Sequence, residues 1–285
     1  MSEGNAPPPC AAPSPRIVHR KNRAAWLAGT GTLFLLLLLL RACIRARVVA
    51  WDIFFRYLFD AEILLGVGNA FLIGTLSLLL ASALGFGVAI ARMSGNPILT
   101  VLSAAYVYLF RGIPMLLQII FWYNSLPIMF PRIHIVVPLL RLTLVDVQMI
   151  DVVTPFRAAL IGISLAETAY MAEIIRGGIS SIDRGQREAA LALGLRRGQV
   201  MRRVILPQAF RTILPSVGNE YINLMKSTSL AMTIGFMEVL RVVTNIYYTT
   251  FEVVELLCVA CFWYLFLGSF ATLLQTVAER LYPKR

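Results

Sequence analysis

The sequence predicts an all-α integral membrane protein, and three observations support this class. The 285-residue chain is 58% hydrophobic and only 14% charged, whereas soluble domains are about 25% charged. Apolar stretches recur that are long enough for a helix to cross a bilayer, which takes roughly 20 residues. The alternating pattern of membrane β-strands is absent from the sequence, and in lipid only helices otherwise satisfy their own backbone groups.

The N-terminal region predicts a cytoplasmic tail followed by a membrane anchor. Residues 1–23 are rich in proline and then basic, which indicates a disordered tail. The leucine run that follows predicts a signal-anchor helix over 24–44 and a periplasmic loop over 45–62. A cleaved signal peptide is the alternative, but the residues after the run are charged and bulky, without the small residues of a cleavage site.

Five further spans are predicted, at residues 63–91, 98–123, 156–176, 216–240 and 257–279. The first of these contains many glycines and alanines, small residues that let membrane helices pack closely. The next is interrupted at Arg111, Gly112 and Pro114, which we interpret as a structural elbow. Either the span kinks there, or residues 98–110 form an interfacial helix and the crossing starts near Gly112.

The distribution of basic residues predicts the orientation of these six spans. If the N-terminus is cytoplasmic, the inside segments hold more than twice as many Lys and Arg residues as the outside segments. Cytoplasmic loops normally carry this excess. Both termini are therefore expected in the cytoplasm, and the connection 177–215 becomes the longest cytoplasmic segment.

The composition argues against several classes of function. The net charge of +11 would suggest nucleic-acid binding in a soluble protein, but here the basic residues cluster between spans. Cys258 and Cys261 lie in an apolar span and are interpreted as packing residues. The two histidines are far apart, and no phosphate-binding Gly-x4-Gly-Lys-Ser/Thr loop or catalytic triad occurs. We expect no catalysis, no metal and no cofactor in this chain.

Segment 177–215 has the pattern of a docking surface. It contains Gln186, the run Glu188-Ala189-Ala190, then Gly194, and finally Leu206-Pro207. Small residues permit close backbone approach, glycine lets a helix turn, and proline ends one. An amphipathic helix pair on anionic lipid would explain the basic residues, but it would not explain this spacing.

This spacing resembles the cytoplasmic loop of permease subunits of binding-protein-dependent ABC importers, with Val204 where the family usually has isoleucine. Further sequence motifs resemble those of the polar amino acid branch of that family, and the resemblance covers about residues 63–280. These motifs are Phe110-Arg111-Gly112-Ile113-Pro114, Ala169-Tyr170-Met171-Ala172-Glu173-Ile174-Ile175-Arg176-Gly177-Gly178-Ile179, Gly185-Gln186-Arg187, Leu206-Pro207-Gln208-Ala209 and Lys226-Ser227-Thr228-Ser229-Leu230.

The resemblance implies a type I ABC importer permease fold with five core helices, here plus one extra N-terminal helix. It implies that residues 188–207 form a coupling helix on a cytoplasmic ABC ATPase dimer, which binds the ATP and Mg that this chain does not. It also implies a periplasmic substrate-binding protein, and a second permease or a second copy as the membrane partner. The expected location is the bacterial inner membrane.

Polar residues inside spans are costly and mark candidate substrate contacts. Glu167 could receive the amino group or a cationic side chain of an amino acid, or it could satisfy a neighbouring span. Glu173 and Arg176 are spaced for an ion pair on one helix face. The remaining candidates for the substrate path are Tyr170, Asn219, Asn223, Lys226 and Thr228. Asn219, Asn223 and Lys226 share one face, although Lys226 could instead extend to the inner surface.

Two other functional classes remain open at this stage. A secondary transporter would need its own ion site and would normally show repeated halves, and neither is evident. A membrane scaffold could use the same loop without a transport path. The sequence does not identify the substrate, and it does not decide between a homodimer and a heterodimer.

Overall fold

The computed structural model describes residues 49–137 and 142–283, together with residues 30–32, 34, 35, 38 and 41. The chain divides into two units, Met1–Val49 and Ala50–Arg285. The few described residues between 30 and 41 are helical. The predictions for the tail 1–23 and for most of the anchor 24–44 lie outside the described residues.

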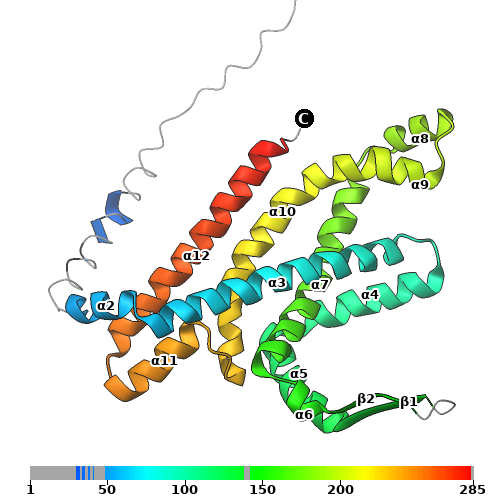
Figure 1. Cartoon of the computed structure of the whole chain (residues 1–285). Helices are drawn as coiled ribbons and strands as arrows, with labels where there is room; N and C mark the ends of the chain where they lie inside the picture. The colour runs from blue at the N-terminus through cyan, green and yellow to red at the C-terminus, as the bar shows by residue number, and fades with distance from the viewer. Residues whose placement is uncertain are drawn as a thin grey trace, which may run out of the picture. The chain divides into compact units, whose positions relative to one another are not determined.

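Three helices of the second unit are each long and apolar enough to cross a bilayer: α3 (Ala61–Arg92), α7 (Pro155–Ser180) and α12 (Val253–Leu281). Helix α3 packs against α7, which it crosses in Figure 1. A Cβ atom at Gly85 of α3 would lie only 2.6 Å from the Cβ atom of Met171 in α7. The small residues noted in the sequence therefore set the distance between these two helices.

The predicted span 98–123 consists of two helices, α4 (Pro97–Gly112) and α5 (Met115–Met129), with a bend of 102° between them. The bend lies at Arg111, Gly112 and Pro114. Buried Gln118 holds it, because its Nε2 donates to the carbonyl oxygens of Phe110 at 3.0 Å and Ile113 at 2.9 Å. These two bonds satisfy backbone groups that the bend leaves open.

The predicted span 216–240 is not one continuous helix. Helix α10 (Leu206–Ser227) begins earlier than predicted and passes into the 3₁₀ turn η2 (Thr228–Ile234), and α11 (Val239–Thr250) follows after a bend of 49°. Gly235 has a φ of +81°, and the buried carboxylate of Glu238 accepts bonds from the backbone N–H groups of Leu240 and Arg241. This cap starts α11, and the apolar pattern of the sequence did not reveal it.

By length and composition, the described residues thus contain three spans, or up to five if each bent pair forms one span. Their buried side chains form three clusters. One lies where α12 meets α11 and α2, one lies between α5 and α7, and one lies at the base of segment 184–206. The third cluster joins the predicted docking loop to the membrane helices.

Two elements of the structure were not predicted from the sequence. Residues 45–62, predicted as a loop, contain the helix α2 (Trp51–Leu58). After α5, an antiparallel hairpin of β1 (Arg132–Val137) and β2 (Leu142–Gln148) leads into α6 (Met149–Val152) and extends away from the helices (Figure 1). In the hairpin, two hydrogen bonds of 2.7 Å from Arg132 hold the pKa of Asp146 below its ordinary value.

Candidate functional site

The predicted docking segment forms two short helices joined by a tight turn. Helix α8 (Arg184–Ala192) is capped by Asp183, whose Oδ1 accepts from the N–H of Gly185 at 2.7 Å. It ends at Ala192, the chain turns at Gly194, where φ is +81°, and α9 (Arg197–Val200) follows. The N–H of Leu195 returns to the carbonyl oxygen of Ala190 at 3.2 Å. The glycine is required here because other residues rarely adopt a positive φ.

The inner face of this helix pair is fixed to the membrane helices. Ala190 is only 5% exposed, and it packs in one cluster with Val200 and Ile205 of the loop and Ile175 and Ile179 of α7. The small side chain at Ala190 therefore serves packing within the chain. Of the two alanines that were interpreted as leaving room for a partner, only Ala189 faces outward.

The outer face carries the residues that a partner can reach. Gln186, Glu188 and Ala189 are exposed on α8. Leu193, which was not among the predicted coupling residues, is 83% exposed at the tip beside Gly194. The sequence analysis did not single out this exposed leucine at the tip of the loop. Figure 1 shows α8 and α9 projecting beyond the ends of α7 and α10.

Leu206 and Pro207 lie in the first turn of α10. The interpretation that this proline ends a helix is wrong, because α10 starts at Leu206 and continues past Pro207, which lies in its first turn. A π-helical turn, η1 (Met201–Ile205), precedes it. The motif therefore marks the start of a long helix that runs from the loop into the membrane part of the chain.

A cavity of about 520 Å³ lies beside the loop. It separates Met93 and Ser94, in the connection between α3 and α4, from Arg187 and Arg197 of the loop. Close by, Glu173 forms ion pairs with Arg92 of α3 and with Arg176, the latter at 2.8 Å. The ion pair within α7 was predicted, whereas the link to α3 was not, because it joins residues far apart in the sequence.

Glu167 lies within α7 and is only 4% exposed. Its Oε1 has no hydrogen-bond partner among the described residues, and no ion pair involving Glu167 occurs in that part of the chain. The negative charge of Glu220 in α10 acts on Glu167 through space. A buried carboxylate that experiences a second negative charge, and that has no ion-pair partner within the described ranges, is energetically unfavourable.

The other candidates for the substrate path fall into separate places. Asn219, Asn223 and Lys226 are exposed along α10, and the Oδ1 of Asn219 lies 3.3 Å from Nε2 of Gln275 in α12. Thr228 is buried, and its hydroxyl donates to the carbonyl oxygen of Met225 at 2.9 Å, so it does not join them.

Tyr170 belongs with the elbow instead. The guanidinium of Arg111 lies 5.2 Å from the centre of the Tyr170 ring, a cation–π distance. This contact ties the end of α4 to α7. Gln118 is the elbow residue that sequence reasoning missed, although a glutamine in an apolar run just after Pro114 is a usable signal. No group of His, Cys, Asp and Glu residues within the described ranges could hold a metal ion.

These features define a multi-pass membrane protein with a structured loop at one end of its helices. The family model of binding-protein-dependent transport system inner membrane components matches residues 81–282. The chain belongs to this family, and it is accordingly an inner-membrane component of a transport system.

Individual relatives agree with this assignment. The chain is 35% identical to the arginine transport system permease protein ArgU of Corynebacterium glutamicum over 294 residues, covering 100% of this chain and 89% of the relative. It is 35% identical to the octopine transport system permease protein OccM of Rhizobium radiobacter over 226 residues, covering 78% and 87%. A crystal structure of an amino acid ABC transporter with histidines matches with a TM-score of 0.65 and 27% identity, covering 77% and 93%.

Proposed function

We propose that this chain is the permease subunit of an ATP-driven importer that moves a polar amino acid or amino acid derivative into the cytoplasm by alternating access. The observation that carries the proposal is the family match together with the loop geometry, in which α8 and α9 project from an anchored base. A separate cytoplasmic ABC ATPase dimer supplies the energy and binds ATP and Mg. A periplasmic substrate-binding protein delivers the substrate, and a second permease or a second copy completes the membrane part.

The loop provides a mechanical connection between the ATPase and the membrane helices. Gln186, Glu188, Ala189 and Leu193 form its outer face, which docks on the ATPase. Its inner face packs on α7, and Leu206-Pro207 leads directly into α10. When the ATPase dimer closes, the loop moves as a unit and carries the inner ends of α7 and α10 with it.

The substrate passes the buried carboxylate of Glu167, which together with Glu220 forms an acidic site between α7 and α10. Because no cation neutralises Glu167 within the described residues, a positively charged group of the substrate is suited to do so. The relatives named above for arginine and octopine transport fit a guanidinium-bearing substrate. The exposed row of Asn219, Asn223 and Lys226 lines the same route next to the partner permease.

Uptake into vesicles tests this function. The complete complex, purified with its ATPase and reconstituted in liposomes, is expected to accumulate radiolabelled arginine only with ATP and the binding protein. Accumulation driven by a proton or sodium gradient without ATP would instead identify a secondary transporter. The absence of both kinds of uptake for every polar amino acid and derivative tried, with the complex intact, would identify a membrane scaffold.

A further inference from the structure

The short helix α2, which precedes the first long span of the second unit, has three distinct sides. Successive residues of a helix are about 100° apart around its axis. Phe54 and Leu58 are buried on one side, and Trp51 and Phe55 form an exposed row next to them. Asp52 and Arg56 are exposed on the side beyond that row. Thus protein, aromatic and charged faces follow one another around the helix.

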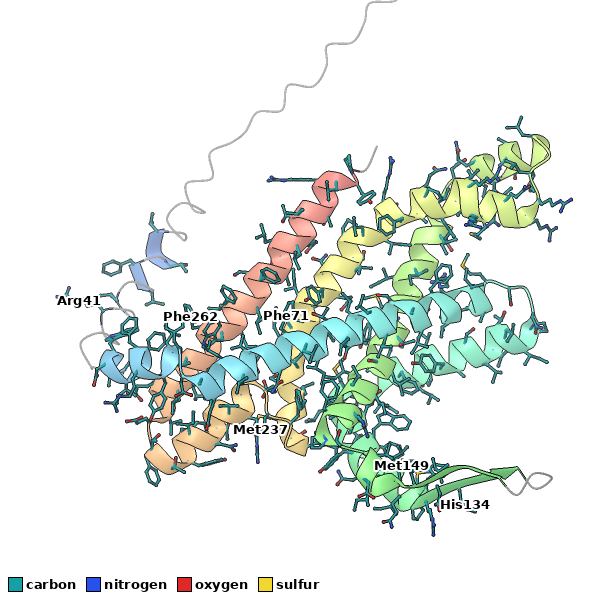
Figure 2. All side chains as sticks on the ribbon, in the orientation of Figure 1. Arg41, Phe71, His134, Met149, Met237 and Phe262 are labelled. Carbon is teal, nitrogen blue, oxygen red and sulfur yellow. The ribbon has the colours of Figure 1, made fainter. Side chains whose placement is uncertain are left out.

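The buried side fixes α2 to the start of α12. Phe54 and Leu58 belong to the same cluster as Val259 and Trp263. The indole N–H of Trp263 donates to the carbonyl oxygen of Leu58 at 2.9 Å. The backbone N–H of Ala50 donates to Glu255 at 3.0 Å. Figure 2 shows the labelled Phe262 where α12 passes α2.

The aromatic row is large and open. Trp51 is 60% exposed, Phe55 is 65% exposed and Phe59, which continues the row just past the helix end, is 66% exposed. Three adjacent aromatic side chains of this exposure are unusual on a surface that faces only water. The aromatic row is stabilised by an apolar environment, whereas the charged side chains of Asp52 and Arg56 are stabilised by water.

We propose that α2 lies in the headgroup region of the bilayer and anchors the adjoining ends of α3 and α12, with the aromatic row in contact with lipid. A membrane interface supplies an apolar and an aqueous side next to each other, in the order that the helix requires, and it is where tryptophan is enriched. The position also fits, because α3 begins with its Asp60 cap immediately after Phe59.

Spin labels at two positions of α2 test this proposal. The full-length chain, with Cys10, Cys43, Cys258 and Cys261 replaced by serine, is placed in nanodiscs of phosphatidylethanolamine and phosphatidylglycerol. It carries either Phe55→Cys or, as a matched control three residues away, Asp52→Cys. We expect relaxation by oxygen, which concentrates in the bilayer, to dominate at position 55, and relaxation by a water-soluble nickel chelate to dominate at position 52.

Two outcomes would overturn the proposal. Equal access of the nickel chelate to both positions would place the aromatic row in water. Shielding of position 55 from both reagents would show that protein covers it, whether a partner or residues 24–44 of this chain. If the cysteine-free chain does not fold, brominated lipids replace the spin labels. The emission of Trp51 is obtained by subtracting the fluorescence of Trp51→Phe from that of the native chain. Brominated lipids must quench this emission. Failure of this quenching counts against the proposal, and uptake activity is not involved.

Discussion

Gly194 is the residue on which the shape of the docking loop depends most directly. A Cβ atom there would meet nothing within 4 Å, so the requirement for glycine comes only from its φ of +81°. A left-handed conformation costs other residues roughly 1–2 kcal/mol, and a β-branched residue more. The loop tip, with Leu193 beside it, is therefore expected to change when Gly194 is replaced.

We predict that Gly194→Val lowers ATP-driven uptake by about tenfold, since about 1.4 kcal/mol corresponds to a factor of ten. ATP hydrolysis by the complex and membrane insertion should remain. Uptake and hydrolysis are measured on the same liposomes, and the amount of substrate taken up per ATP hydrolysed is compared. Gly198→Val in the same loop is the control, because Gly198 has an ordinary φ and open space around it. Normal coupling in Gly194→Val would argue against a docking role for this turn.

Glu167 is the residue whose charge the proposed substrate neutralises. Glu167→Gln keeps its size but removes its charge. Losing one partner of a buried ion pair costs about 2 kcal/mol or more, so arginine uptake should fall about 30-fold. Uptake of a neutral amino acid, if the complex accepts one, should not fall.

The control for this prediction is Glu62→Gln, which changes an exposed carboxylate at the start of α3. Initial uptake rates at saturating binding protein are the measurement. Unchanged arginine uptake in Glu167→Gln would mean that this carboxylate serves a neighbouring helix and not the substrate. That was the alternative left open by the sequence.

At the scale of elements, the contact between α3 and α7 offers a test of packing. Gly85 and Gly87 both lie in α3, but only Gly85 faces α7 closely. A Cβ atom at Gly85 would collide with Met171 and Ala172, whereas one at Gly87 would meet nothing within 4 Å. Overpacking typically costs about 1–3 kcal/mol, so Gly85→Ala should lower the thermal midpoint of unfolding in detergent.

Gly87→Ala should leave that midpoint unchanged or raise it slightly, because alanine is the better helix former. Equal effects of the two substitutions would mean that α3 and α7 are not tightly packed at Gly85. The sequence predicted close packing of this helix from its small residues, but it could not say which glycine faces which neighbour.

The elements themselves were predicted unevenly, and the reasons are physical. α3, α7 and α12 follow from apolar runs, because transfer into lipid depends on composition along one segment. The elbow at Pro114 also follows, because proline acts locally. The break at Gly235 does not, because it depends on Glu238, on its bond from Tyr264 and on the bond from Asn69 to Met237.

At the scale of the whole molecule, the proposed orientation places the docking loop and both termini in the cytoplasm. The excess of Lys and Arg in the inside segments supports it. We predict that Ala192→Cys in a cysteine-free chain reacts with an impermeant maleimide only after cells are opened. His134→Cys, on the hairpin where Figure 2 labels His134, should react in cells in which only the outer membrane or cell wall is permeabilised. The reverse pattern would contradict the orientation and the coupling role.

The sequence by itself determined the membrane class, most of the apolar segments and the loop spacing that resembles importer permeases. Each of these depends on residues close together in the chain, through the cost of placing them in lipid or through local backbone geometry. Only the tertiary structure decided that Ala190 faces inward, that Gln118 holds the elbow and that Glu167 is buried with no ion-pair partner among the described residues. These depend on contacts between helices far apart in the sequence, and a one-dimensional pattern carries no distance between them.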